Sequence, residues 1–366
     1  MKNKQFMERA LELAKKARGW TNPNPLVGAV IVKDGKVIAE GYHERIGAWH
    51  AERNALNQLD SSVDLSNASM YVTLEPCCHE GRTPPCTQVI IDSGIKHLVI
   101  ATLDPNAIVA RKGVKQLEEA GITVECGLLE EESRQMNEIF NHFITTQRPF
   151  VTLKYAMTMD GKIATRSKLS KWITSQSARA HVHEERQAHA SIMVGVGTVL
   201  KDNPSLTVRR EGKESSKLVR IICDSQLRTP LDSTVVETAT DAPTWIATTV
   251  EDTRKYQDYL DKGCFILLTK KTESGQVDLN DLMVRLGERE IDSVYLEGGS
   301  QLNWSALESG IVQRVHTYIA PKLFGGQAAL SPISGLGVDQ PSDAFQLTIR
   351  KVQMFEPDIL IESEVN

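Results

Sequence analysis

The sequence is poor in aromatic residues and has no excess of positive charge. Only 5% of its 366 residues are Phe, Trp or Tyr, and 42 Lys and Arg stand against 47 Asp and Glu, giving a net charge of −5. The first 147 residues carry 16 basic and 19 acidic side chains and the remainder 26 and 28, so neither part is strongly basic. The charge pattern therefore argues against a nucleic-acid-binding or membrane-surface protein.

Long apolar runs and a disulfide framework are also missing. Lys, Glu and Arg interrupt the apolar positions of the first 20 residues, which is unlike a secretory signal, so we expect a cytoplasmic protein. Six cysteines are too few for a disulfide scaffold, but Cys77, Cys78 and Cys86 lie close together, which favours a metal site. A composition with 41% hydrophobic and 24% charged residues is that of a globular protein, and the length suggests two domains.

Helical and strand-like patterns alternate through the first 147 residues. Apolar positions from Phe6 to Ala17 repeat at helical spacing and predict a helix that ends near Gly19, and a hairpin follows with the turn Asp34-Gly35. The further predicted segments are helix 51–59, strand 70–74, helix 87–93, strand 97–101, helix 114–120, strand 122–126 and helix 130–143. This order predicts an α/β domain around one sheet, and the polar, proline-ended stretch 145–149 marks its boundary.

The second part of the chain is also rich in strand-like segments. The predicted strands are 150–156, 191–196, 219–223, 244–247, 265–268, 293–297 and 315–320, with helical patterns between several of them. The late runs 345–352 and 358–361 have no helix between them. We therefore expect the second sheet to end in an antiparallel hairpin.

One imidazole and two thiols of the first domain have the pattern of a catalytic zinc site. His50-Ala51-Glu52 opens a predicted helix, Cys77 follows a strand, and Cys86 begins another helix. Three such ligands leave the fourth tetrahedral position for a water, whose pKa zinc lowers, and Glu52 is placed to handle the protons. The pieces match the zinc deaminase signature H-x-E…P-C-x-x-C.

The second half of this signature departs from the pattern, because eight residues separate Cys77 from Cys86. Either this segment bulges outward, or Cys78 or His79 replaces one of the ligands. We favour Cys77 and Cys86.

Several strings of the first domain closely resemble the deaminase half of the bifunctional RibD family of riboflavin biosynthesis. They are residues 23–28 (PNPLVG), 50–52 (HAE), 74–86 (LEPCCHEGRTPPC) and 104–106 (DPN). The resemblance implies a cytidine-deaminase-like α/β/α domain over 1–147 that removes the 2-amino group of 2,5-diamino-6-ribosylamino-4(3H)-pyrimidinone 5′-phosphate. It assigns zinc to His50, Cys77 and Cys86, and proton shuttling to Glu52. Loop positions that match substrate contacts are Asn24, His43, Arg82, Asp104 and Asn106.

Two glycine segments of the second domain are candidates for a phosphate-binding turn. Gly195-Val196-Gly197-Thr198 follows an apolar strand, but Leu200 stands where a dinucleotide fingerprint has its third glycine. Gly298-Gly299 lies between a strand and a helical stretch, where backbone amides meet a phosphate at a helix start. An ordinary strand-to-helix turn has the same pattern.

Residues 154–164, 170–174, 195–199, 202–207 and 297–299 resemble the reductase domain of the same family, so the resemblance covers almost the whole chain. It implies a dihydrofolate-reductase-like α/β domain over 148–366 that uses NADPH to reduce the ribosyl group to ribityl. Positions that match cofactor contacts are Ala156, Trp172, Thr198, Asp202, Ser225, Gly299, Ser300, Gln301, Leu302, Asn303, Trp304 and Ser305. Positions that match substrate contacts are Ser170, Arg186, Leu206, Arg209 and Glu297. We assign no proton-transfer role to Lys154 or Asp160.

Two other functions compete with this interpretation. The first is a polynucleotide-editing deaminase, against which the slightly acidic charge of both domains argues. The second is a deaminase whose second domain is a non-catalytic scaffold, which would not bind NADPH. We expect small pyrimidine nucleotides as substrates, one zinc and NADPH as cofactors, no nucleic-acid or membrane partner, and a homo-oligomer, either a dimer or a tetramer.

Overall fold

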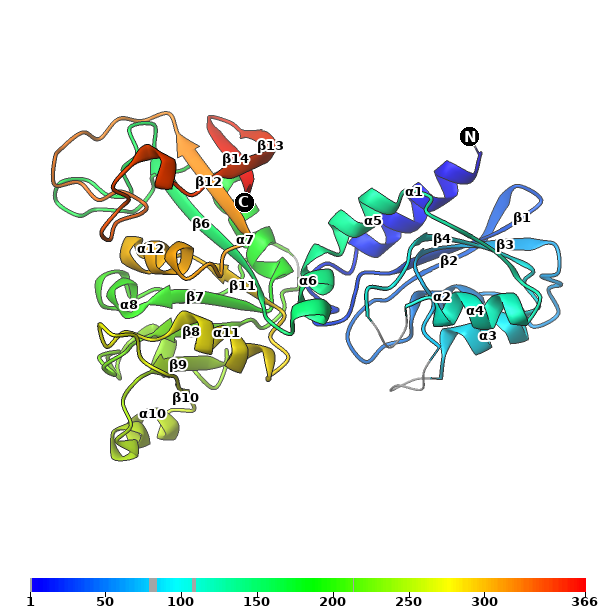
Figure 1. Cartoon of the computed structure of the whole chain (residues 1–366), viewed down its shortest axis with the longest axis horizontal. Coiled ribbons are helices and arrows are strands. Elements are labelled where there is room, and N and C mark those ends of the chain that lie inside the picture. The colour runs from blue at the N-terminus through cyan, green and yellow to red at the C-terminus, as the bar shows by residue number, and fades with distance from the viewer. Residues whose placement is uncertain (1, 79–83, 107–109, 213) are drawn as a thin grey trace. The chain divides into compact units, whose positions relative to one another are not determined.

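The computed structural model of the chain describes residues 2–366 except 79–83, 107–109 and 213. The chain forms two compact units, Met1–Gln147 and Arg148–Asn366 (Figure 1). Among the described residues, no helix combines the length and the apolar character that a membrane span requires.

The first unit is built on a five-stranded sheet with the order β2-β1-β3-β4-β5. Its strands are β1 (Gly28–Lys33), β2 (Lys36–Tyr42), β3 (Ala68–Leu74), β4 (His97–Thr102) and β5 (Thr123–Cys126). Its helices are α1 (Lys2–Lys15), α2 (Ala51–Leu56), α3 (Cys86–Ser93), α4 (Lys112–Glu119), α5 (Glu130–Met136) and α6 (Glu138–Thr146). β1 pairs antiparallel with β2 and β3, whereas β3, β4 and β5 are parallel. The predicted hairpin and the α/β alternation are confirmed.

Helices cover both faces of this sheet. Met7 and Ala10 of α1 pack with Val30 and Val99 on one face, and α5 lies on the same side as α1 in Figure 1. On the other face, Ala55 of α2, Ile90 of α3 and Leu117 of α4 pack against strand residues such as Ile31 and Met70. The apolar residues that alternate along the strands thus form two cores, and the unit is a three-layer α/β/α sandwich.

The structure corrects several predicted helix boundaries, and α2, for example, ends at Leu56 and not at position 59. The first helix ends at Lys15, and a run of tight turns replaces its predicted continuation to Gly19. The predicted helix 130–143 is two helices, because the buried Asn137 leaves the helical conformation between them. Its amide donates to the Leu26 carbonyl at 2.9 Å and accepts from the Leu26 N–H at 2.8 Å. These two bonds tie the break to the loop before β1.

The second unit is built on a nine-stranded sheet with the order β10-β9-β8-β7-β11-β6-β12-β14-β13. Its strands are β6 (Phe150–Thr158), β7 (Ser191–Gly195), β8 (Val219–Cys223), β9 (Thr244–Thr248), β10 (Phe265–Leu268), β11 (Ser293–Leu296), β12 (Arg314–Ala320), β13 (Leu347–Phe355) and β14 (Asp358–Val365). Its α-helices are α7 (Gln176–Ala188), α8 (Val196–Asp202), α9 (Thr234–Glu237), α10 (Gln257–Asp261), α11 (Leu279–Gly287) and α12 (Ser300–Glu308). Short 3₁₀ helices cover Thr253–Tyr256 and Pro341–Asp343.

The strands from β10 to β12 in this sheet run parallel, whereas β14 pairs antiparallel with β12 and β13. The predicted antiparallel hairpin at the end of the sheet is thus confirmed. Leu282 of α11 and Ala306 of α12 pack with Met193 and Leu296 in one core. A second core around Ile222, with residues of α8, α9 and α10, lies on the opposite face of the sheet. Both faces are covered, as a parallel sheet requires.

Candidate active sites

The starts of two helices and the end of a strand position three metal-binding side chains in the first unit. His50 is the N-cap of α2, Cys86 is the first residue of α3, and Cys77 follows β3. The backbone N–H of Cys86 donates to the Cys77 sulfur at 3.4 Å, so the start of α3 also favours a thiolate at Cys77. Helix α2 packs closely against β2. A Cβ at Gly41 would lie only 2.4 Å from the Ala51 carbonyl oxygen, so this contact requires glycine.

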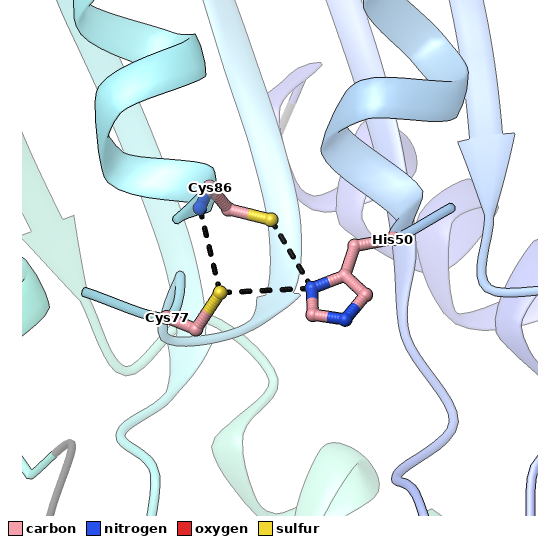
Figure 2. Close-up of side chains that lie close together, drawn as sticks. All are labelled: His50, Cys77 and Cys86. Carbon is pink, nitrogen blue, oxygen red and sulfur yellow. Dashed lines mark hydrogen bonds between the residues drawn. The ribbon is translucent and has the colours of Figure 1, made fainter. Parts of the chain in front are cut away.

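The three donor atoms have the spacing of a tetrahedral metal site. His50 Nδ1 lies 3.2 Å from Cys86 Sγ and 3.6 Å from Cys77 Sγ, and all three atoms lie within 4.8 Å of one another (Figure 2). Zinc bonds of about 2.1 Å to nitrogen and 2.3 Å to sulfur separate tetrahedral ligands by about 3.5 to 3.8 Å. The residues present therefore fit a zinc ion with one open coordination position.

The two thiols and the neighbouring carboxyl of Glu52 shift one another's pKa values. A hydrogen bond from Cys86 lowers the pKa of Cys77, and the same bond together with burial raises the pKa of Cys86. Because thiolates are the metal-binding form, both Cys77 and Cys86 would be deprotonated when they hold a metal ion. Burial raises the pKa of Glu52, whose exposed fraction is 3% and whose carboxyl contacts Cys86. Glu52 is therefore able to hold a proton beside the metal ligands.

A buried histidine orients an asparagine next to this cluster. The ring of His43 lies 5.4 Å from that of His50, and its Nδ1 donates to the Trp49 carbonyl at 3.0 Å. Its Nε2 is then the acceptor for the Asn24 side-chain N–H at 3.3 Å. Burial lowers the pKa of His43, which keeps it neutral. With its Nδ2 bonded to His43, the orientation of the Asn24 side-chain amide is fixed.

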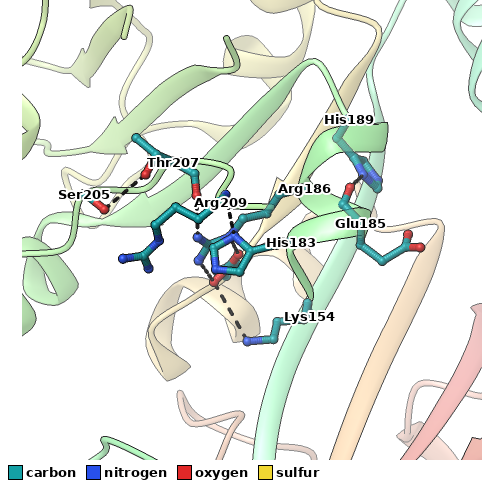
Figure 3. A network of polar contacts seen from close by, with 9 residues as sticks. Lys154, His183, Glu185, Arg186, His189, Ser205, Thr207 and Arg209 are labelled. Carbon is teal, nitrogen blue, oxygen red and sulfur yellow. Dashed lines mark hydrogen bonds and ion pairs between the residues drawn. The ribbon is translucent and has the colours of Figure 1, made fainter. Parts of the chain in front are cut away.

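A second buried cluster in the second unit consists of charged side chains. Arg186 of α7 donates to both carboxylate oxygens of Glu297, from Nε at 2.5 Å and from Nη2 at 2.9 Å, and Lys154 Nζ of β6 lies 3.9 Å from Glu297. Figure 3 shows Arg186, His183 and Lys154 of this cluster. Although burial opposes it, Arg186 and Lys154 lower the pKa of Glu297 to about 2. Burial, assisted by Arg186 and Arg209, lowers the pKa of His183 to about 4. The centre therefore has two cations for one anion.

The two glycine segments lie together at the ends of β7 and β11. The N–H of Gly195 donates to the Gly298 carbonyl at 2.9 Å. Helix α8 begins directly after β7, and three residues separate the end of β11 from the start of α12. Gly298 has φ +91°, and a Cβ there would lie 3.1 Å from Asn303 Oδ1. A Cβ at Gly299 would lie 3.7 Å from Thr198 Oγ1. The positive φ of Gly298 thus requires glycine at that position. At Gly299, the missing side chain leaves space next to Thr198 at the start of α12.

Comparison with known proteins identifies the family of both parts of the chain. The family model described as RibD C-terminal domain matches residues 149–361, and the cytidine and deoxycytidylate deaminase zinc-binding region matches residues 1–102. The riboflavin biosynthesis protein RibD of Actinobacillus pleuropneumoniae is 54% identical over 362 residues, which cover 99% of this chain and 95% of that protein. The chain belongs to the RibD family.

Solved RibD structures share the fold of the whole chain. A deaminase/reductase from Thermotoga maritima has a TM-score of 0.89 and 40% identity and covers 100% of this chain and 99% of its own. A RibD of Acinetobacter baumannii has the same TM-score at 32% identity, with the same coverage. The expected cytidine-deaminase-like domain followed by a dihydrofolate-reductase-like domain is confirmed. Like other RibD proteins, the chain is a bifunctional deaminase and reductase of riboflavin biosynthesis, and its deaminase domain is a zinc-binding one.

The structure brings together several of the residues predicted to act in the RibD deaminase. Glu52 and the three ligands form one cluster, and Asn24 and His43 lie beside it. Asp104 and Asn106 follow β4, with the Asn106 N–H donating to Asp104 Oδ1 at 2.8 Å. Arg82 and the alternative ligand His79 lie outside the described residues. Cys78 is not a member of the described ligand cluster.

The predicted reductase residues are more scattered. Arg186 contacts Glu297, Thr198 lies near Gly299, and Ser300 and Gln301 form the first turn of α12. Five other predicted residues form no hydrogen bond or ion pair, within the described residues, with Arg186 and Glu297 or with Thr198 and Gly299. They are Ala156, Ser170, Trp172, Asp202 and Ser225.

Other predicted contacts are partly buried in the fold. The Leu206 side chain lies in a hydrophobic core, so only the backbone of this residue is available to a ligand. The backbone has a positive φ of +50° there. Asn303 is buried and donates to the Pro332 carbonyl at 2.8 Å, and Leu302 packs against a core. The Trp304 ring meets the Phe345 ring edge to face. The remaining members of the two sets are Ser305, half-buried on α12, and Arg209, whose backbone N–H donates to His183.

Sequence reasoning missed three groups near the sites. Glu75 is a buried carboxylate directly after β3, and Lys154 joins the charged cluster although no role was assigned to it. His183 lies beside Arg186 on α7. The only signal was a charged residue next to or within an apolar strand, which is too common to identify a site. Asp160 instead accepts hydrogen bonds from the backbone N–H groups of Phe324 and Gly325.

Proposed function

We propose that residues 1–147 deaminate 2,5-diamino-6-ribosylamino-4(3H)-pyrimidinone 5′-phosphate and that residues 148–366 then reduce the ribosyl group with NADPH, giving 5-amino-6-(5-phosphoribitylamino)uracil. The observation that carries the proposal is the cluster of His50, Cys77 and Cys86 beside a buried Glu52, in a chain that continues into a reductase domain. The solved Thermotoga maritima protein is described as a diaminohydroxyphosphoribosylaminopyrimidine deaminase and 5-amino-6-(5-phosphoribosylamino)uracil reductase.

In the deaminase, the residues of the chain bind the metal, orient the base and move protons. Bound zinc supplies a Lewis acid that activates water at neutral pH. Glu52 takes a proton from the attacking water and returns it to the departing amine, and its raised pKa suits this exchange. The amide oxygen of Asn24, oriented by His43, accepts a hydrogen bond from an N–H of the pyrimidine. The net change exchanges the amine for an oxygen and releases ammonia.

In the reductase, the N-terminus of α12 and the charged cluster divide the binding between them. The amides after Gly299 and the hydroxyl of Thr198 suit an NADPH phosphate, because a helix start attracts anions. Bound NADPH supplies the hydride. Arg186, Lys154 and Glu297 carry a net positive charge in a largely buried place, which suits the polar, phosphate-bearing pyrimidine.

We also propose that the protein is a homo-oligomer in which a second copy covers β13. This strand lies at the edge of its sheet and exposes a row of large apolar side chains: Leu347, Ile349, Val352 and Met354. An exposed edge of this kind is normally covered. Light scattering of the wild type should give a dimer or tetramer, and the double substitution Ile349→Asp with Val352→Asp should give monomers. Monomeric wild-type protein would contradict the proposal.

The function is tested by supplying the purified protein with the diaminopyrimidinone nucleotide, first alone and then with NADPH. Ammonia should appear in the first step, and NADPH should be oxidised only after it. NADPH fluorescence should also change on binding, whereas a non-catalytic scaffold would leave it unchanged. Ammonia release from a polynucleotide but not from the nucleotide would instead identify an editing deaminase.

A further inference from the structure

A buried carboxylate outside the metal cluster joins three separate segments of the deaminase unit. Glu75 directly follows β3 and has an exposed fraction of 3%. Its Oε2 accepts the backbone N–H groups of Asp104 at 3.2 Å and Arg111 at 3.0 Å, and its Oε1 accepts that of Val114 at 3.2 Å. These donors lie 29 to 39 residues further along the chain, so the bonds are tertiary contacts.

The burial of this charge is balanced by the donors around it. A buried carboxylate is costly unless several hydrogen bonds compensate it, and backbone amides at the start of a helix are favourable donors because of the helix dipole. Arg111 and Val114 supply such amides at the start of α4. Glu75 is thus the acceptor that fixes this helix start, together with Asp104, against the end of β3.

The neighbouring glycine shows that this close packing is built into the sequence. A Cβ at Gly113 would lie 2.3 Å from the Pro76 carbonyl oxygen and 3.2 Å from Glu75 Oε1. A larger residue would push α4 away from the end of β3. Only glycine therefore allows the carboxylate to reach the amides of α4.

The segment that Glu75 holds carries two of the proposed substrate contacts. The Glu75 N–H donates to the Thr102 carbonyl at 3.0 Å, so β3 and β4 end side by side, and Asp104 follows directly. Asp104 Oδ1 in turn accepts the Asn106 N–H. Ligands of open α/β sheets bind at the carboxyl ends of the strands, which is also where Cys77 lies.

We propose that Glu75 is a positioning residue of the deaminase: it holds Asp104 and Asn106 in place for the pyrimidine nucleotide without contacting the metal or the substrate. This inference rests on the proposed function. It separates the role of Glu75 from that of Glu52, because Glu75 acts through backbone amides and Glu52 through proton transfer.

Two substitutions separate the contribution of the side-chain length of Glu75 from that of its negative charge. Glu75→Asp keeps the charge but is one methylene too short to meet all three amides, and Glu75→Gln keeps the length but replaces one acceptor oxygen by a donor. We expect KM of deamination to rise roughly 10- to 100-fold in the Asp variant and less in the Gln variant, with a smaller change in kcat. Glu119→Gln, on the exposed side of α4, is the matched control and should equal the wild type.

Three further readouts distinguish positioning from general damage. Zinc per chain and NADPH oxidation with the supplied deaminated intermediate should stay at the wild-type level in both variants. Hydrogen exchange at the amides of Asp104, Arg111 and Val114 should become faster. Unchanged KM and unchanged exchange would overturn the proposal, and so would loss of zinc in a folded variant, because Glu75 would then act on the metal site. If the wild type itself releases no ammonia, the proposed function fails, and the exchange data still show whether Glu75 holds the segment.

Discussion

The two buried centres of this chain carry charge of opposite sign. The first centre holds an imidazole and two thiols, which amount to two negative charges when both thiols are ionised, and so it matches a divalent cation. The second holds Lys154 and Arg186 around the single carboxylate of Glu297, and His183 beside them is neutral because its pKa is lowered to about 4. The first centre is therefore suited to a metal and the second to an anionic or strongly polar molecule.

The comparison also shows two ways of holding a buried charge. In the deaminase, Glu75 is held by three backbone amides, two of them at the start of α4, and one further backbone amide, at the start of α3, reaches the Cys77 sulfur. In the reductase, Arg220 is fully buried, and its five hydrogen bonds within the described residues go to neutral oxygens, among them the Ser205 and Val235 carbonyls. In the reductase the Arg220 side chain therefore binds backbone carbonyls, whereas in the deaminase backbone amides bind the Glu75 side chain.

The largest effect is expected at the metal site. Cys86→Ser removes one of three ligands, so the protein should lose its zinc, and ammonia release should fall to background. NADPH oxidation with the deaminated intermediate should continue. Metal analysis by mass spectrometry, together with both assays, checks the prediction. Full zinc retention would show that another residue is the third ligand.

Arg220→Met should destabilise the second unit by roughly 3 to 5 kcal/mol, because it leaves buried carbonyl oxygens without a donor. Urea unfolding of the second unit, monitored through the loss of NADPH oxidation, should show a lower midpoint. The midpoint of zinc release from the first unit should stay at its wild-type value. A common shift of both midpoints would contradict the separate stabilities of the two units.

Glu297→Gln should destabilise the second unit by about 3 kcal/mol at neutral pH, because the pKa of Glu297 falls from 4.5 to about 2 on folding. A lowered folded-state pKa means that the stabilisation is complete above about pH 5 and is lost as the pH falls through 4.5 toward 2. The difference between wild type and variant should therefore shrink over that range. Urea unfolding at several pH values measures it, and a constant difference would refute the ion-pair explanation.

The smallest effect is expected at the neighbouring thiol. Cys78 lies outside the described ligand cluster, and burial raises its pKa, which opposes the thiolate that a metal needs. Cys78→Ser should keep the full zinc content and both activities. Loss of zinc in this variant would favour the alternative in which Cys78 is the ligand.

Much of the first site was predictable because its signals are local. Residue type and spacing identified His50, Cys77 and Cys86, and Asp34-Gly35 identified the hairpin, since both turn residues have positive φ. The break at Asn137 was not predictable, because it depends on hydrogen bonds to a residue 111 positions away.

The second site shows where sequence reasoning stops. The glycine pairs were visible, but Arg186 and Glu297 lie 111 residues apart, and nothing in the spacing shows that they meet. Without the family resemblance, they read as ordinary charged residues. The role of Glu75 was missed for a related reason, because its partners are backbone amides, which any residue offers.

The central claim, that one chain carries two separate chemistries, is tested most directly by measuring ammonia release and NADPH oxidation on the same preparations of Glu52→Ala and Gly299→Trp. Glu52→Ala should lower the rate of deamination by about 10²- to 10⁴-fold and leave the reduction of supplied intermediate unchanged. Gly299→Trp should stop NADPH oxidation by covering the start of α12, and keep zinc and ammonia release. If Glu52→Ala, folded by circular dichroism, lost both half-reactions, the two-site account would be contradicted.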